Sequence, residues 1–316
     1  MSSVLRSEAM EPPTLAAPAV VDVVHETVYR YARPVELAQH IAFLRPRDDA
    51  GQRLVAFELD IEPRPARRSD EPDAFGNTRT LFALNTPHDA LRVTARSRVQ
   101  WRPPAPHAPA PAWEDARARW RYVSGGAPEP AVPFVFASPL LPLHEPLRDW
   151  AQPSFTPGRP LDEAALELMN RLHAGFRYDP DATHVGTPVL EAFERRAGVC
   201  QDFAHLMIAA LRSLGLAARY VSGYLLTAPP PGQPRLLGAD ASHAWVAVAL
   251  PQPEGPSAWL ELDPTNDCVA GPGHVRLATG RDYGDVTPLR GVIRGGGHHE
   301  LTVSVDSLPV GASPGA

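Results

Sequence analysis

Cys200 is the residue whose type and position best suit chemistry, and it is one of only two cysteines in the chain. It opens a segment, residues 200–214, in which apolar residues recur every three or four positions, and Gly215 follows as a C-terminal cap. This pattern predicts a helix with Cys200 in its first turn, where free N–H groups and the helix dipole favour the nucleophilic thiolate. On position alone, a buried structural cysteine explains the pattern equally well.

A cysteine nucleophile needs a base to hold its proton, and the base needs an acceptor that orients it. His243 opens a predicted strand, residues 243–250, and Asp263 ends the next one, residues 258–263. The Pro- and Gly-containing stretch between them is typical of a hairpin connection, and a hairpin centred near residue 254 places the two side chains opposite or diagonal to each other, about 5–8 Å apart. A strand histidine or an Asp-Pro turn would each explain one residue alone, but the joint pattern favours a Cys-His-Asp site.

Three motifs that occur in this order carry a family resemblance. They are Gly-Val-Cys-Gln-Asp-Phe-Ala-His at 198–205, Ala-Ser-His-Ala-Trp-Val at 241–246 and Leu-Asp-Pro-Thr-Asn at 262–266. Together they resemble the transglutaminase-like superfamily, and more narrowly the bacterial transglutaminase-like proteins, which are candidate cysteine proteases with an N-terminal β domain of their own. The stretches 44–47, 75–77 and 280–296 are similar to that subgroup as well.

The resemblance implies an α+β fold with a papain-like core and a triad in the order Cys, His, Asp. By position, it makes Cys200 the nucleophile, His243 the base and acid, and Asp263 the group that orients the histidine. The implied chemistry is attack of the thiol on an amide to give a thioester. Water as acceptor makes such an enzyme a protease or amidase, and an amine makes it a transglutaminase.

An oxyanion hole needs two donors, and the backbone N–H of Cys200 at the start of its helix is the natural first one. A side-chain donor is expected from the segment before the cysteine. Tyr178, in Phe-Arg-Tyr-Asp, is the candidate, although a packed aromatic residue is the commoner role for such a tyrosine.

No cofactor or metal is expected. His184, His298, His299 and Cys268 form no recognised ligand spacing, and the chain has no phosphate-loop or dinucleotide fingerprint. Asp202 falls in the first turn of the cysteine helix, where a carboxylate suits the dipole, and His205 is expected to pack on that helix.

The leading hypothesis is a cysteine hydrolase of peptide or amide bonds in a peptide or protein substrate. A transferase that forms isopeptide bonds on the same triad is the first alternative. The second is a non-catalytic peptide-binding module, which has no need of all three triad residues. The basic residues are all arginine, so the chain offers Gln side chains but no Lys side chain for self-crosslinking.

Composition narrows the class of partner and the compartment. The chain has 316 residues, a formal net charge of −6 and 44% hydrophobic residues, which argues against nucleic acid or an anionic membrane as the main partner. Two cysteines form no disulfide framework, residues 1–18 have no signal-peptide core, and no run of about 18 apolar residues predicts a membrane span. These features favour a bacterial cytoplasmic protein and leave its oligomeric state open.

The length suggests two domains. Residues 20–102 show several period-two strands between turn signals and predict a β-rich N-terminal domain, either a sandwich or a barrel. Arg92, Arg96 and Arg98 share one face of its last strand, where a solvated face is a better explanation than a binding site for an acidic ligand. Helices followed by strands predict an α+β core with an antiparallel sheet. The expected divisions are a disordered tail at 1–19, the β-rich domain at 20–102, a Pro-rich connector at 103–160, the catalytic core at 161–306 and a tail at 307–316.

Overall fold

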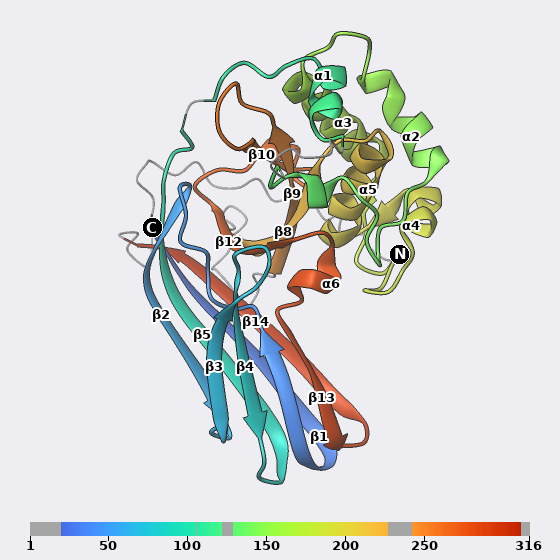
Figure 1. Ribbon diagram of the computed structural model, residues 1–316. Helices are drawn as coiled ribbons and strands as arrows, with labels where there is room; N and C mark the ends of the chain where they lie inside the picture. The colour runs from blue at the N-terminus through green and yellow to red at the C-terminus, as the bar shows by residue number, and fades with distance from the viewer. Residues whose placement is uncertain (1–19, 106, 122–128, 227–241, 311–316) are drawn as a thin grey trace, which may run out of the picture.

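The computed structural model describes residues 20–105, 107–121, 129–226 and 242–310. Within these ranges the chain forms a mixed α+β fold with two parts, a β-rich lobe and a core lobe that carries the helices (Figure 1). None of the helices in the described ranges is long and apolar enough to cross a membrane.

One sheet of seven strands builds the β-rich lobe. The strands are β1 (Val20–Ala42), β2 (Gln52–Glu62), β3 (Arg67–Pro72), β4 (Thr78–Leu84), β5 (His88–Trp101), β13 (Leu289–Gly295) and β14 (His299–Pro309). β1 is central, because its first half pairs with β5 and β14 and its second half with β4 and β13. β2 and β3 extend the sheet beyond β5 and β4.

The sheet folds back on itself at the end of the lobe that lies away from the core lobe (Figure 1). The register of β1 shifts there between Arg30 and Val35, and short connections separate β2 from β3, β4 from β5 and β13 from β14. The result is a half-barrel in which two layers of strands face each other. Its interior is a separate apolar core that includes Leu59, Ile61, Phe82, Leu84, Leu91 and Val93.

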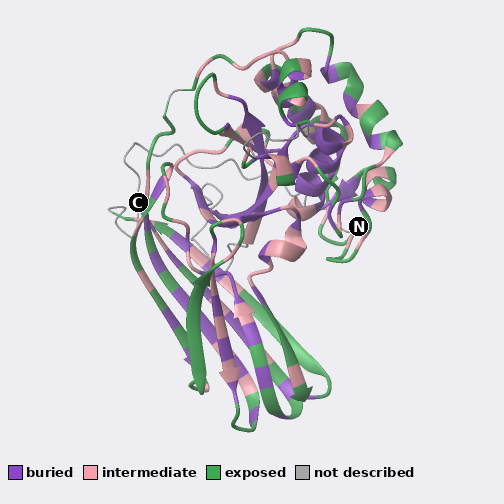
Figure 2. Ribbon diagram, viewed as in Figure 1, coloured by how far each residue is buried: buried purple, intermediate pink, exposed green. Residues whose placement is uncertain are grey.

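Alternation of buried and exposed residues along these strands agrees with the predicted period of two (Figure 2). The three arginines of β5 lie on the outer face, and each pairs with a carboxylate of a neighbouring strand. The pairs are Arg92 with Glu26, Arg96 with Asp60 and Arg98 with Asp22. These ion pairs account for the arginine row without an acidic ligand.

A five-stranded antiparallel sheet with the order β11-β10-β9-β8-β12 forms the centre of the core lobe. Its strands are β8 (Ala218–Leu225), β9 (Ser242–Leu250), β10 (Ala258–Asp263), β11 (Cys268–Val269) and β12 (His274–Gly280). The helices are α1 (Trp113–Arg119), α2 (Glu145–Ala151), α3 (Leu161–Gly175), α4 (Val189–Arg195), α5 (Cys200–Ser213) and α6 (Tyr283–Val286). α5 packs on β8 and β9 and is surrounded by α2, α3 and α4, so that residues 202–212 are all buried.

The predicted divisions need three corrections. Residues 103–160 are not a connector where they are described, because α1 and α2 place apolar side chains such as Trp113 and Leu147 in the main core. The core lobe does not run to 306, because β13 and β14 pair with β1 in the β-rich lobe. The expected tail at 307–316 begins too early, since β14 continues to Pro309. The tail expected at 1–19 lies outside the described residues.

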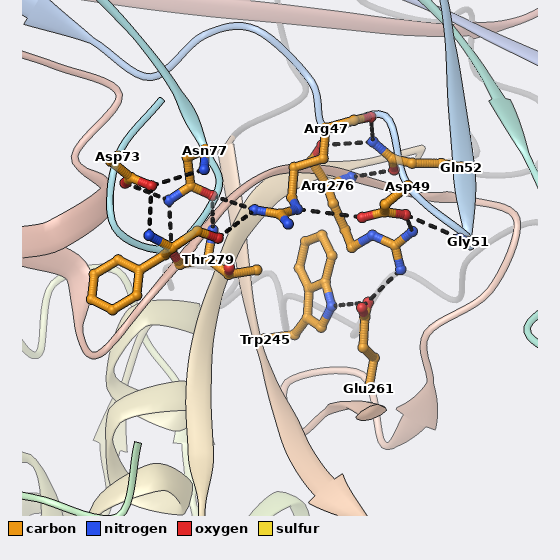
Figure 3. A network of polar contacts seen from close by, with 11 residues as sticks. Arg47, Asp49, Gly51, Gln52, Asp73, Asn77, Trp245, Glu261, Arg276 and Thr279 are labelled. Atoms are coloured by element: carbon orange, nitrogen blue, oxygen red, sulfur yellow. Dashed lines mark hydrogen bonds and ion pairs between the residues drawn. The ribbon is translucent and has the colours of Figure 1, made fainter. Parts of the chain in front are cut away.

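Polar contacts join the two lobes beside the central sheet (Figure 3). Arg276 of β12 donates to Asp49 of the β1–β2 connection at 2.6 Å, and its backbone N–H donates to the Gln52 side chain at 2.9 Å. The side-chain oxygen of Asn77 accepts the backbone N–H of Thr279 at 2.8 Å. The β-rich lobe is therefore anchored on the same sheet that carries the candidate site.

Candidate active site

Cys200 is the first residue of α5, as the sequence predicted. The carboxylate of buried Asp202 accepts the backbone N–H of Val199 at 2.8 Å and the hydroxyl of Thr183 at 2.6 Å. A side chain at Gly198 would place its Cβ 2.5 Å from that carboxylate. Because Gly198, two residues before the cysteine, has no side chain, the Asp202 carboxylate has room to cap the start of α5. This cap fixes the backbone around the thiol.

The hairpin that carries the other two residues has the predicted register, with Ala258 opposite Leu250 and Leu262 opposite Val246. This register sets His243 and Asp263 diagonally across the open end of the strand pair. His243 Nε2 donates to Asp263 Oδ2 at 2.7 Å. The sequence argument for an imidazole beside a carboxylate is confirmed in this geometry.

His243 links Asp263 to Cys200. Because Nε2 of its ring is bonded to Asp263, Nδ1 is the nitrogen that remains for the thiol. Burial lowers the pKa of His243, but the charge and hydrogen bond of Asp263 and a hydrogen bond with Cys200 together raise this pKa to about 10. The histidine is therefore an imidazolium at neutral pH, which is the partner that a thiolate requires.

Asp263 is 0% exposed and accepts five hydrogen bonds. Besides His243, the donors are the backbone N–H groups of Thr265 and Asn266, the Asn266 side chain at 2.7 Å and His274 Nε2 at 3.1 Å. Burial alone would raise the pKa of Asp263, but the charge of His243 and the hydrogen bonds from both histidines hold it well below its usual range. The carboxylate is thus ionised and fixed in one orientation.

His274 is a site residue that the sequence analysis did not find. It begins β12, and its Nδ1 accepts the backbone N–H of Gly271 at 3.1 Å. Because Nδ1 is an acceptor, the ring proton lies on Nε2, which donates to Asp263. The only available sequence signal was a histidine at the head of a short apolar run, His-Val-Arg-Leu-Ala-Thr-Gly, which predicts a strand but gives no partner.

Trp245 packs beside both histidines. Its ring is stacked near His243, with centroids 6.0 Å apart, and lies edge-on to His274 at 5.2 Å. The indole N–H donates to Glu261 at 2.9 Å, and Arg276 donates to the other oxygen of the same carboxylate at 2.8 Å. Figure 3 shows this chain of contacts continuing from Arg276 to Asp49 of the β-rich lobe.

Tyr178, the candidate oxyanion donor, lies close to the nucleophile in the backbone. It ends the short strand β6 (Arg177–Tyr178), which pairs in parallel with β7 (Ala197–Gly198) and sets Tyr178 opposite Gly198. Burial, followed by the negative charge of Cys200, raises the pKa of Tyr178, so its phenol keeps its proton. The side chain is 42% exposed and does not line the cavity beside Cys200.

That cavity lies between the two lobes. Cys200 and His243 line it together with residues of α5, β8, β9 and α6 in the core lobe and of β1, β13 and β14 in the β-rich lobe. The lining includes His25, Thr27, Tyr29, Gln201, Tyr220, Ser222, Tyr283, Leu289, Leu301 and Val303.

The side chains of His243, Asp263 and His274 offer ligand atoms within 4.8 Å of one another. Hydrogen bonds already explain this cluster, because both histidines direct Nε2 at the same carboxylate oxygen and His274 Nε2 carries the ring proton. A metal ion would have to displace these protons. The other cysteine, Cys268, is free, and burial and the charges of Asp263 and Asp267 raise its pKa to about 12.

His205, which was expected to pack on the cysteine helix, is buried there. Its Nε2 accepts the backbone N–H of Tyr283 at 3.2 Å. Burial lowers the pKa of His205 to about 4, so it is neutral at physiological pH. This contact ties α5 to α6 and gives His205 a structural role.

Comparison with known proteins shows the family of the chain. Residues 21–100 match the family described as "Bacterial transglutaminase-like N-terminal region", and residues 148–264 match "Transglutaminase-like superfamily". The chain belongs to this superfamily. Cys200, His243 and Asp263 fall within the second match, whereas His274, β13 and β14 lie beyond it.

Two mycobacterial relatives cover almost the whole of this transglutaminase-like chain. An uncharacterized protein of Mycobacterium tuberculosis is 43% identical over 91% of this chain and 92% of its own length. An uncharacterized protein of Mycobacterium leprae is 32% identical over 90% of this chain and 96% of its own length.

A third relative matches only part of the chain. A "Protein-glutamine gamma-glutamyltransferase" of Pseudomonas aeruginosa is 28% identical over 48% of this chain and 20% of its own length.

A solved structure shares the fold of both lobes. The "Putative Cysteine Protease" from Cytophaga hutchinsonii superposes with a TM-score of 0.70, covering 93% of this chain and 92% of its own, at 19% sequence identity. At that identity the likeness shows the fold alone.

Proposed function

We propose that this protein is a cysteine hydrolase that cleaves a peptide or amide bond through a thioester on Cys200. The observation that carries the proposal is the hydrogen-bonded line from Asp263 through His243 to the thiol at the start of α5. Each residue type fits its role, since the carboxylate is ionised and the imidazole is protonated beside the nucleophile.

In the first half-reaction, the Cys200 thiolate attacks the carbonyl carbon and His243 gives its proton to the leaving amine. The S–C bond forms, the C–N bond breaks, and a thioester and a neutral imidazole remain. In the second, His243 takes a proton from water as the oxygen attacks the thioester carbonyl. The C–S bond breaks, the carboxylic acid leaves, and the thiolate and imidazolium are restored.

The backbone N–H of Cys200 is the proposed first donor to the oxyanion, because it lies at a helix start and points away from the helix body. Tyr178 remains the proposed second donor. It keeps its phenolic proton, and β6 holds its backbone beside Gly198.

Transfer to an amine is the second candidate function. It is supported by the likeness to the Pseudomonas glutamyltransferase over about half of this chain. Water and amine acceptors use the same thioester, so they are distinguished by the product and not by the triad.

The test uses a Gln-containing peptide library and mass spectrometry of the protein after brief exposure. We expect an acyl adduct on Cys200, and we expect Cys200→Ala and His243→Ala to reduce turnover by at least about 10⁴-fold, as removal of a triad member does elsewhere. Cys268→Ser is the matched control and should keep full activity, because that thiol is held protonated.

The same assay with and without monodansylcadaverine distinguishes the two acceptors. Release of ammonia or of a new N-terminus that is unaffected by the amine supports hydrolysis. Incorporation of the fluorescent amine at the expense of hydrolysis contradicts the hydrolase proposal and supports the transferase instead. Absence of any adduct on a Cys200 that iodoacetamide still alkylates contradicts both.

A further inference from the structure

The cavity beside Cys200 has one wall in the β-rich lobe. Thr27 and Tyr29 of β1 and Leu301 and Val303 of β14 line it there. These residues are cross-strand neighbours, with Thr27 opposite Val303 and Tyr29 opposite Leu301. The wall is therefore one continuous patch of sheet, and a substrate that fills the cavity touches this patch as well as the nucleophile.

No Asp, Glu, Lys or Arg is among the described residues that line the cavity. Its polar groups are largely hydroxyls, and burial raises the pKa values of Tyr220 and Tyr283, so these phenols stay neutral. Burial also lowers the pKa of His25 to about 4, and its ring nitrogens are bonded to the hydroxyls of Tyr224 and Thr27. Among the described lining residues, His243 is the one whose raised pKa keeps it charged at neutral pH.

The size of the cavity fits a side chain better than a larger ligand. Its volume is about 260 Å³, which is below the roughly 300–1,000 Å³ of pockets that enclose a drug-sized molecule. One or two residues of a peptide can enter it, with the peptide continuing toward solvent.

We propose that this cavity binds one uncharged side chain of the acyl donor, and that β1 and β14 form the wall that selects it. The inference rests on the proposed acyl-transfer function. A charged side chain would lose its hydration in the cavity, and His243, the lining residue that could pair with an anion, is already bonded to Asp263 and Cys200. An aliphatic, aromatic or carboxamide side chain can use both the apolar wall and the hydroxyls. The selected side chain belongs to the acyl part of the substrate and not to the amine part. The acyl part must stay oriented through both half-reactions, whereas the amine leaves after the first.

Val303 is the best position for a test. Its side chain is 48% exposed, so a charged residue can be introduced into the wall without overfilling a packed core. Leu308 is the matched control, since it is 44% exposed on the same strand and its side chain points to the opposite face of the sheet.

The experiment compares the wild type, Val303→Lys, Val303→Glu and Leu308→Lys in acylation by p-nitrophenyl esters of N-acetylleucine, N-acetylglutamate and N-acetylarginine. We expect the wild type to be acylated by the leucine ester at least about tenfold faster than by the other two. Val303→Lys should raise the ratio of the glutamate rate to the leucine rate by about tenfold, because the added cation attracts the carboxylate. Val303→Glu should raise the ratio of the arginine rate to the leucine rate by about the same factor. Leu308→Lys should leave both ratios unchanged. Ratios in the Val303 variants equal to those of the wild type would overturn the selecting wall.

A second measurement distinguishes failure of this inference from failure of the proposed function. Alkylation of Cys200 by anionic iodoacetate and neutral iodoacetamide needs no acyl transfer. If no ester acylates the wild type, the proposed function fails. The wall then still stands if Val303→Lys raises and Val303→Glu lowers the ratio of iodoacetate to iodoacetamide rates, and it is overturned if both variants leave that ratio as it is in the wild type.

Discussion

His274 acts on the site through Asp263 and not through the substrate. Its Nε2–H occupies the same carboxylate oxygen that His243 uses, and the Gly271 N–H fixes its tautomer. It therefore acts as a positioning residue, which restricts rotation of the carboxylate and stabilises its ionised form.

Replacing His274 should slow turnover without weakening substrate binding. A hydrogen bond to a charged group contributes about 1.5–3 kcal/mol, so His274→Ala is expected to lower kcat by about tenfold to a hundredfold, with KM unchanged. His274→Gln keeps an N–H donor and should recover part of the rate. Steady-state kinetics test this, with His298→Ala as the surface control. Equal losses in the Ala and Gln variants would point to a packing role alone.

The raised pKa of His243 predicts how stability depends on pH. Burial lowers this pKa and Asp263 raises it to about 10, so the folded state holds the proton more tightly than the unfolded chain, whose histidine titrates near about 6.5. The stabilisation is complete below that pH and is lost as pH rises through about 10. Asp263, whose pKa is lowered, contributes fully above about pH 3.9 and loses its contribution in acid.

Asp263→Asn removes both contributions. The difference in Tm between the wild type and Asp263→Asn should therefore be largest between about pH 4 and pH 6.5 and should shrink toward pH 10. In the variant, the pKa of His243 should fall well below about 10, because the charge of Asp263 is lost while the effect of burial remains, and NMR titration of the ring measures this directly. A constant Tm difference across the range would show that the pair is not the source of the shift.

At the scale of elements, the parts with strong periodicity could be predicted. β10 has the predicted bounds, and α5 begins at Cys200 as expected, because the alternation of apolar residues in a strand and their helical spacing in a helix both show which face is buried. The position of the loop between β9 and β10 was enough to predict the register of this hairpin. That register in turn predicted that His243 lies beside Asp263.

Elements with no local signal were missed. β3 has six residues that are all exposed, and its pairing with β4 is set by the neighbouring strand and not by its own sequence. β13 contains Gly291, whose lack of a side chain makes room for His40 on β1; an added Cβ would lie 2.2 Å from that ring. Such contacts between distant segments have no periodicity that a single sequence reveals, and the pairing of His274 with Asp263 was missed for the same reason.

Gly198 leaves the space that the cap at the start of α5 needs. An added Cβ would lie 2.5 Å from the Asp202 carboxylate, which is buried and bonded to Val199 and Thr183. Gly198→Ala should therefore disturb the cap, cost about 1–3 kcal/mol of stability and slow alkylation of Cys200. Gly175→Ala is the control, since nothing lies within 4 Å of its added Cβ. Equal alkylation rates and unfolding free energies in the two variants would contradict a role for the cap.

At the scale of the whole molecule, the chain crosses between the lobes twice. It leaves the β-rich lobe after β5, builds the core lobe, and returns as β13 and β14 to complete the first sheet. The lobes also share the contacts of Arg276 and Asn77 and the wall of the cavity beside Cys200. The expected division into consecutive domains did not foresee this, because the returning strands are far from β1 in sequence.

Removal of the first 102 residues would take β1 away from both returning strands. A fragment of residues 103–316 keeps β13 and β14 but loses β1, the strand with which both pair, and unpaired strands with exposed N–H and C=O groups promote association. We expect this fragment to aggregate, whereas residues 103–287, which lack the returning strands, should be more soluble because they expose fewer open edges. Gel filtration and thermal unfolding followed by circular dichroism measure the difference. A monomeric 103–316 fragment with the Tm of the full chain would mean that the core lobe folds independently and that the returning strands add nothing to its stability.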